Sequence, residues 1–176
     1  MDPLRNFGFL LKDVSRLSSR NFELHAFELG LTLPQCKVLV YLARNEGINQ
    51  IRLADLTDTD PMTMVRIIDR MEQDGWVERR QGEEDRRERR LYLTARAAPV
   101  VERIWAIGDR SRAEALAGLS AAERAQLIRL LERIHGNLAA LLPGAVDAAR
   151  NCLPLTPPRK EAKSTATRAK SPRKPA

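Results

Sequence analysis

The stretch of sequence from residue 61 to residue 94 reads PMTMVRIIDRMEQDGWVERRQGEEDRRERRLYLT. Pro61 fits the first turn of a helix, and the helical pattern runs up to Gly75. Two segments with strand character follow, 76–80 and 89–93, and a charged turn separates them. This order predicts a helix that leads directly into a β-hairpin.

A short helix is expected just upstream, at about 51–57, and the polar segment 58–60 forms a turn between it and the longer helix. A short helix, a tight turn and a second helix make up the DNA-reading unit of helix-turn-helix proteins, and a following hairpin adds a wing. We therefore expect residues 48–94 to form a winged helix-turn-helix lobe, called the winged lobe below.

The chain on both sides of the winged lobe has the apolar spacing of helices, at 4–29, 35–45, 95–116 and 121–142. Thr32, Thr94 and Ser120 are the expected N-caps, and Ser120 forms a capping box with Glu123. The predicted fold class is therefore mostly α with a small β-hairpin wing.

The last two expected helices carry more apolar side chains than a small winged lobe can cover. These are Ile104, Trp105, Ile107, Leu127, Ile128, Leu130, Leu131, Ile134, Leu138, Leu141 and Leu142. An unpaired apolar surface of that extent is a liability on a monomer, so we expect a homodimer.

Positive charge is concentrated near the C-terminus. The chain has 30 Lys and Arg against 23 Asp and Glu, a net charge of +7. Residues 157–176 alone account for +6 of this charge, which leaves the rest of the chain nearly neutral. Residues 143–176 are predicted to form a basic disordered tail, because they lack apolar periodicity. Such a tail either adds non-specific phosphate contacts or only keeps the protein soluble.

Several classes of protein are excluded by what the sequence lacks. No apolar run of ~18 residues and no signal peptide is present, so we expect no membrane span and a cytoplasmic location. Cys36, Cys152, His25 and His135 have no metal-ligand spacing, and there is no Gly-rich phosphate loop or nucleophile with an evident base. We therefore expect no metal, no cofactor and no enzymatic activity, and Cys36 is interpreted as a small core residue.

The helix that opens the quoted stretch has one face suited to DNA. Thr63, Arg66 and Arg70 recur at spacings of three and four, with Ile67 on the same face and Met62 in the first turn. Arginine is the usual partner of guanine in the major groove, and threonine contacts phosphate or the thymine methyl. The alternative is an ordinary amphipathic helix with a solvated arginine face.

The hairpin adds to this interpretation. Seven arginines and no lysine lie between residues 76 and 96, and Arg86 and Arg87 are at the expected tip. An arginine at a wing tip fits a narrow minor groove. Asp85 is expected to orient the guanidinium of Arg87 or Arg66, or else is a solvated turn residue. Five acids lower the net charge of residues 76–96 to +2, so the segment is not a simple basic patch. What indicates DNA binding is the combination of helix, wing and spacing.

From Leu31 to Leu142 the sequence resembles the MarR family of bacterial transcription regulators, close to its SlyA-like branch. The resemblance is carried by Leu31-Thr32-Leu33-Pro34-Gln35, Leu53-Ala54-Asp55, Pro61 through Glu72, Gly75-Trp76-Val77-Glu78-Arg79, Asp85-Arg86-Arg87, Leu91-Tyr92-Leu93-Thr94, and Leu119-Ser120 followed by Glu123. All of these segments occur in the family's order and at its spacing.

The resemblance implies an obligate homodimer that binds a pseudo-palindrome in double-stranded DNA. Residues 1–47 and 95–142 are then the helical dimerisation region, and the two recognition helices lie ~34 Å apart. Thr63 and Arg66 match positions that contact bases or phosphates, and Arg87 matches the wing-tip arginine, with Asp85 as its partner acid.

The resemblance also implies a small effector, often phenolic or aromatic, that binds between the dimerisation region and the winged lobe and lowers DNA affinity. Arg16 falls at a position similar to an anchor for acidic ligands in some relatives. A solvated or dimer-interface arginine is the simpler interpretation of Arg16.

Two alternatives remain for the function. The first is an architectural DNA-binding protein whose tail supplies most of the affinity, and deletion of residues 157–176 would distinguish it from a sequence-specific repressor. The second is a winged-helix module that binds protein, and substitution of Arg66 or Arg87 by alanine would separate it from a DNA reader.

Overall fold

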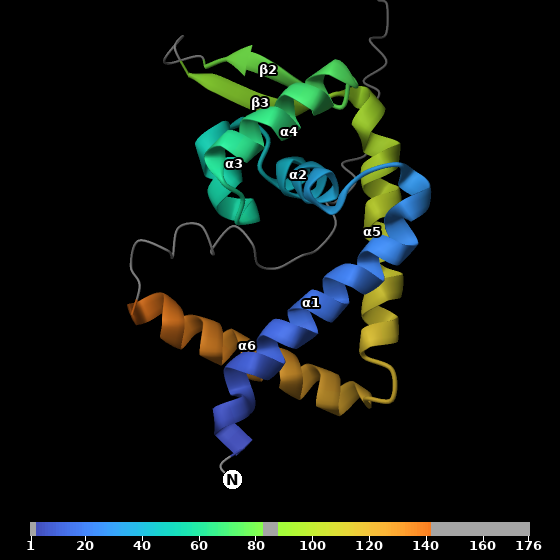
Figure 1. Cartoon of the computed structure of the whole chain (residues 1–176), viewed down its shortest axis with the longest axis vertical. Coiled ribbons are helices and arrows are strands. Elements are labelled where there is room, and N and C mark those ends of the chain that lie inside the picture. The colour runs from blue at the N-terminus through green and yellow to red at the C-terminus, as the bar shows by residue number, and fades with distance from the viewer. Residues whose placement is uncertain (1–2, 83–87, 142–176) are drawn as a thin grey trace, which may run out of the picture.

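The computed structural model describes residues 3–82 and 88–141 and is mostly helical around a small antiparallel sheet (Figure 1). The helices are α1 (Phe7–Ala26), α2 (Leu33–Arg44), α3 (Gln50–Thr57), α4 (Pro61–Gln73), α5 (Ala98–Ala115) and α6 (Ala121–Leu141). Short 3-10 turns are η1 (Pro3–Asn6), η2 (Phe27–Leu29) and η3 (Ala95–Ala97). The strands are β1 (Ile48–Asn49), β2 (Val77–Gln81) and β3 (Arg89–Leu93). The predicted fold class is confirmed.

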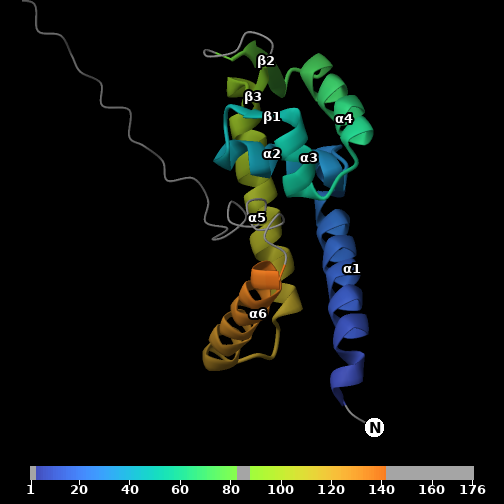
Figure 2. The same ribbon diagram turned by 90° about the vertical axis from the view of Figure 1, so that its left-hand side faces the viewer.

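The strands and helices α2, α3 and α4 gather at one end of the long helix α5, and α6 begins at its other end (Figure 1). In Figure 1 the helices α1 and α6 cross, but the view turned by 90° shows them on separate sides (Figure 2). The first half of α1 and the last half of α5 extend away from the winged lobe, and α6 runs back from the far end of α5 (Figure 1).

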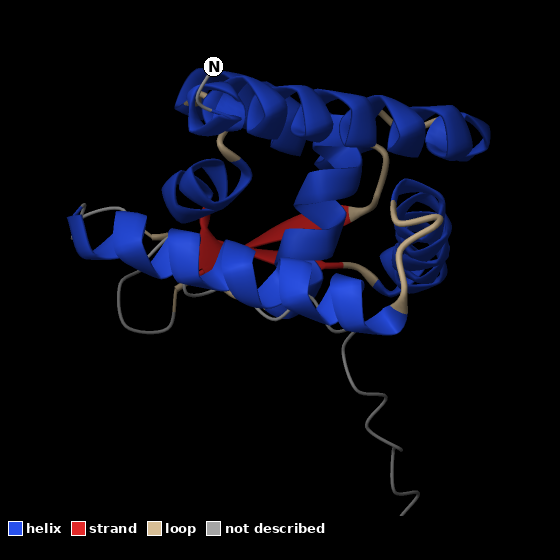
Figure 3. Ribbon diagram, turned by 90° about the horizontal axis from the view of Figure 1, so that it is seen from below, coloured by secondary structure: helices blue, strands red, loops and turns tan. Residues whose placement is uncertain are grey.

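Strand β3 lies at the centre of the sheet, in the order β1-β3-β2, and both pairings are antiparallel. The β2–β3 pair is the predicted hairpin, with Val77 opposite Leu93 and Gln81 opposite Arg89. Strand β1 was not predicted, because two residues are too short to show the alternation of a strand. Seen from below, the strands lie between the surrounding helices (Figure 3).

Local hydrogen bonds explain where most helices begin. The Thr32 side chain accepts from the Gln35 backbone N–H, and Gln35 reaches back to complete a capping box. The Ser120 and Glu123 side chains form the predicted box at the start of α6. Each pair satisfies backbone N–H groups that the first turn of a helix leaves unpaired.

Thr94 occupies the N-cap position of η3, which runs directly into α5, but its side chain makes no capping hydrogen bond. Its hydroxyl instead donates to the backbone carbonyl of Gly75 at 2.7 Å, and the chain passes through η3 before α5 begins. Thr94 thus ties the end of β3 to the turn after α4. Gly75 has φ +74°, a left-handed conformation that glycine adopts without steric cost, and this allows α4 to turn directly into the sheet.

The hydrophobic core joins the winged lobe to its neighbours. Its largest fully buried side chains are Leu39, Leu42, Leu53, Met64, Ile68, Met71, Leu91, Val38, Val77 and Cys36. Burial of each large side chain contributes roughly 1.5–3 kcal/mol. Because α2 supplies several of them, it shares one core with the winged lobe. The boundary between residues 47 and 48 stays a prediction.

The start of α5 also enters this core, through Ala97, Val101 and Ile104. Ile104 was assigned to surplus apolar surface, but it is buried and Trp105 is packed against the same core. The first turns of α5 face the winged lobe, so their apolar residues are covered within a single chain.

Candidate nucleic-acid interface

Helix α4 presents the predicted set of side chains to solvent. Met62, Thr63, Arg66 and Arg70 are all exposed, and they are called the reading face below. Ile67 was placed on the same face, but it is partly buried against the core. It is next to Ile68 at the edge of the buried stripe, so the reading face is narrower than the spacing implied.

The orientation of α4 is fixed at both ends. At its start, the Asp60 carboxylate accepts from the backbone N–H of Thr63 at 3.0 Å. At its end, a guanidinium nitrogen of Arg96 donates to the carbonyl of Asp74 at 3.1 Å, and the same guanidinium lies over the Trp76 ring at 4.7 Å. In between, buried methionine and isoleucine side chains anchor the opposite face. The reading face is therefore held on a rigid helix.

At the end of α4, Arg70 forms an ion pair with the C-cap residue Asp74, with Nε 3.0 Å from the carboxylate. Its side chain is 68% exposed, so it remains accessible to a ligand from solvent. Exposed ion pairs of this kind contribute little to stability, and a phosphate would compete for the same guanidinium.

The hairpin lies beside α4 (Figure 1). Its last described backbone hydrogen bond runs from the Gly82 N–H to the Glu88 carbonyl at 2.9 Å. Three predicted wing residues, Asp85, Arg86 and Arg87, lie outside the described residues, so their roles stay predictions. On the described part of β2, Arg80 pairs with Glu78 and lies over the Tyr92 ring at 4.4 Å.

The position of Arg79 was not predicted: its guanidinium contacts two carboxylates of α4. Its partners Asp69 and Glu72 precede it by ten and seven residues, and the contact crosses from helix to strand. Because the contact joins a helix to a strand, neither a helical nor a strand period relates these residues, and the folded turn at Gly75 brings the three side chains together.

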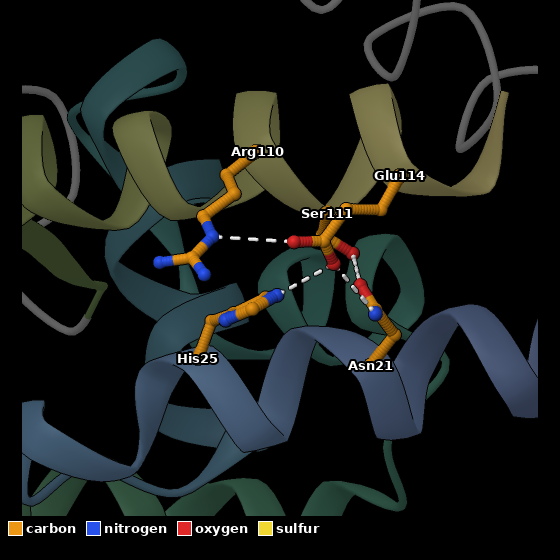
Figure 4. A network of polar contacts seen from close by, with 5 residues as sticks. All are labelled: Asn21, His25, Arg110, Ser111 and Glu114. Carbon is orange, nitrogen blue, oxygen red and sulfur yellow. Dashed lines mark hydrogen bonds and ion pairs between the residues drawn. The ribbon is translucent and has the colours of Figure 1, made fainter. Parts of the chain in front are cut away.

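A polar network joins α1 to α5 below the winged lobe (Figure 4). The Glu114 carboxylate accepts from Asn21 Nδ2 at 2.9 Å and from Arg110 Nε at 3.2 Å, and His25 Nε2 lies 2.7 Å away. The buried Ser111 hydroxyl donates to Asn21. These contacts, the hydrogen bond from Asn21 foremost, lower the pKa of Glu114 from 4.5 to about 2.

A cavity of about 230 Å³ lies close to this network, between α1, α2 and α5. Its walls include Phe22, Tyr41, Ile104 and Trp105, and the cations Lys37 and Arg112 are on its lining. Arg112 pairs with Asp109 on its own helix. The buried Nε1 of Trp105 has no hydrogen-bond partner among the described residues. The cavity thus combines aromatic walls with positive charge.

Arg16 is not one of the residues that line this cavity. It is exposed on α1 and pairs with Asp13 at 2.5 Å, one turn earlier on the same helix. The predicted core position of Cys36 is confirmed, since it is 1% exposed. Burial raises the pKa of its thiol to about 11, which disfavours the reactive thiolate.

Over residues 3–82 and 88–141, no helix is long and apolar enough to span a bilayer. Over the same residues, no three His, Cys, Asp or Glu side chains gather in a way that would hold a metal ion.

Comparisons with known proteins agree with this architecture. The sequence profile of the MarR family matches residues 31–88. The crystal structure of the transcriptional regulator PA3341 is similar at 32% identity, over 76% of this chain and 98% of that chain, with a TM-score of 0.69. The transcriptional regulator SlyA is 29% identical over 85% of this chain and 99% of its own, with a TM-score of 0.66.

A mutant MarR from E. coli complexed with operator DNA is 27% identical, over 76% of this chain and 99% of that chain, with a TM-score of 0.65. The similarity therefore covers the winged lobe together with the long helices around it. From its sequence and its fold, this chain belongs to the MarR family of transcriptional regulators.

Proposed function

We propose that this chain is a homodimeric repressor that binds a pseudo-palindromic operator in double-stranded DNA in the cytoplasm and is released by a small ligand. The observation that carries the proposal is the reading face, which α4 exposes beside the β2–β3 hairpin. The operator complex of the E. coli MarR mutant, a relative of the same fold, supports it. A binding protein, not an enzyme, fits this arrangement.

The reading face has the chemistry of a major-groove reader. Arg66 and Arg70 each offer a planar fork of donors for the O6 and N7 of guanine, and the Thr63 methyl and hydroxyl suit thymine or phosphate. Thr63 is in the first turn of α4, where a recognition helix commonly contacts base edges. Arg86 and Arg87 are proposed to extend the contact into the minor groove.

The dimer is supported by apolar side chains that a single chain leaves exposed. On η1 and α1 these include Leu4, Phe7, Phe9, Leu10, Leu11, Val14 and Leu17, and on α6 Leu127, Ile128, Leu130, Leu131, Leu138 and Leu141. Helix α6 has no buried residue. Solvated apolar surface of this size is unfavourable, and a second copy with the same surfaces would bury it.

The small ligand is proposed to occupy the cavity between α1, α2 and α5. Aromatic walls favour a ring, and Lys37 on the lining favours a carboxylate or phenolate. Because α1 and α5 extend from the winged lobe, a ligand wedged between them and α2 would change the separation of the two reading faces. Benzoate is a suitable probe, with cyclohexanol as a neutral control.

The test is selection of genomic DNA fragments by the purified protein at ~0.15 M salt, where non-specific electrostatic binding is weakened. Enriched fragments that share an inverted repeat support the proposal, and release of those fragments by benzoate supports the ligand class. Fragments without a common sequence contradict it. The same selection with residues 157–176 deleted shows whether the basic tail supplies the affinity, as an architectural protein would require.

A further inference from the structure

Arg79 on β2 connects three elements of the winged lobe. Its Nη2 lies 2.5 Å from Asp69 Oδ1 and its Nη1 donates to the Glu72 carboxylate, both on α4. The same Nη2 lies 3.4 Å from Oε1 of Gln50, the first residue of α3. The Arg79 backbone N–H also donates to Glu72 at 3.2 Å. One side chain therefore links the first wing strand to both helices of the helix-turn-helix unit.

Arg79 faces inward, unlike its neighbour. Successive side chains of a strand point to opposite faces, so Arg79 shares a face with the buried Val77. Its side chain is 18% exposed, whereas that of Arg80 is 58% exposed. A phosphate would reach Arg80 far more readily than Arg79, whose donors are already taken by carboxylates.

The two carboxylates that Arg79 holds are on the helix that carries the reading face. Asp69 and Glu72 are three residues apart, so they lie one turn apart on the same side of α4. Two unneutralised acids there would repel the DNA backbone. A guanidinium satisfies both at once because its donors form a planar fork, which a lysine ammonium lacks.

We propose that Arg79 is a positioning residue for DNA reading. It holds α4 against the first wing strand and offsets part of the negative charge of Asp69 and Glu72, and it does not itself contact DNA. This inference rests on the proposed function, since it assigns the reading face to operator DNA.

The variants are Arg79→Gln and Arg79→Lys, with Arg80→Gln as the matched loss of one charge at the next position. Each is titrated against the duplex that the wild type selects and against a shuffled duplex of the same composition. For Arg79→Gln we expect the loss of affinity on the selected duplex to exceed the loss on the shuffled one by about tenfold, with partial recovery in Arg79→Lys. Arg80→Gln should leave the ratio of the two affinities unchanged.

Two results would overturn the proposal. One is an equal loss of affinity on both duplexes, together with a slope of log affinity against log salt concentration that is smaller by about one. That result would mark a direct phosphate contact. The other is full affinity in Arg79→Gln. Combination with Arg66→Ala adds a further check: the losses should be less than additive if Arg79 acts through the placement of α4, and additive losses contradict that route.

A measurement without DNA separates this proposal from the proposed function. Amide hydrogen exchange along α4 should be faster in Arg79→Gln than in Arg80→Gln, and equal rates overturn the link between β2 and α4. Should Arg79→Gln fail to fold, Glu72→Gln weakens the same link while Arg79 stays in place. If the wild type selects no common sequence, the proposed function fails, and exchange still decides whether Arg79 holds α4.

Discussion

His25 Nε2 on α1 lies 2.7 Å from Glu114 Oε2 on α5, a contact between residues 89 positions apart in the chain. The same carboxylate oxygen accepts from Asn21 at 2.9 Å, so α1 offers two partners one turn apart to a single acid. Both helices extend from the winged lobe (Figure 1), and the network joins them (Figure 4). The network therefore fixes the spacing between α1 and α5 next to the proposed ligand site.

Replacement of Glu114 by glutamine should change how the free energy of unfolding depends on pH in the acidic range. The pKa of Glu114 is lowered from 4.5 to about 2 in the folded chain, so the unfolded chain takes up a proton first as the pH falls. Its contribution to stability is then present above pH 4.5 and is lost between pH 4.5 and about 2. In urea unfolding, the stability difference between wild type and Glu114→Gln should shrink across that window.

The exposed carboxylate Glu28 gives the control, since Glu28→Gln keeps the α1–α5 network intact. If the free energy of unfolding of Glu114→Gln depended on pH in the same way as that of the wild type, the network would not be what lowers the pKa of Glu114.

Arg66→Ala should weaken binding to the selected operator by about 1–3 kcal/mol and relax the base preference at one position of each half-site. The reason is that Arg66 is exposed at the centre of the reading face, and the substitution would remove its proposed two-donor contact to guanine. Competitive titration with single-base variants of the operator measures both effects. Arg103→Ala, an exposed arginine of α5, is the matched control. Unchanged affinity and base preference would remove Arg66 from the interface.

The local pattern of the sequence predicted most of the fold. Proline at the start of α4, glycine at its end and the alternation in β3 each act over a few residues, so they can be recognised without the fold. What escaped prediction depends on contacts between distant segments: the pairing of Ile48 with Leu91, the Thr94 hydroxyl bonded to Gly75, and the burial of Ile104. The spacing of Met62, Thr63, Arg66 and Arg70 placed them correctly on an exposed face.

Leu131→Glu on α6 should shift the dimer–monomer midpoint to at least about tenfold higher protein concentration, because it places a charge in the proposed interface. Sedimentation over a range of concentrations measures the shift. Ile51→Glu is the control, since Ile51 is 68% exposed on α3, within the winged lobe. A wild-type protein that is monomeric at micromolar concentration would contradict the proposed dimer.

Cys36 should resist thiol reagents while the chain is folded. With its pKa raised to about 11 by burial, only about one thiol in a thousand is ionised at pH 8, and the side chain is 1% exposed. In a Cys152→Ser background, Ellman's reagent should react slowly with the native protein and rapidly in denaturant. Rapid reaction of the native protein would mark Cys36 as a candidate oxidant sensor in the wall of the cavity.

Arg96 should stabilise the junction between α4 and the sheet, since it binds the Asp74 carbonyl at 3.1 Å and covers the Trp76 ring at 4.7 Å. We expect Arg96→Ala to lower the free energy of unfolding by about 1–2 kcal/mol, the sum of one hydrogen bond and one cation–π contact. The chain has two tryptophans, so a Trp105→Phe background makes Trp76 the reporter.

In that background, Arg96→Ala should shift the native Trp76 emission toward longer wavelength, because the ring loses its cover. Arg96→Lys should restore part of the stability and little of the emission, since an ammonium stacks less well on an indole. Equal stability and emission in all three proteins would show that the end of α4 is held by the Thr94–Gly75 hydrogen bond and the buried side chains without Arg96.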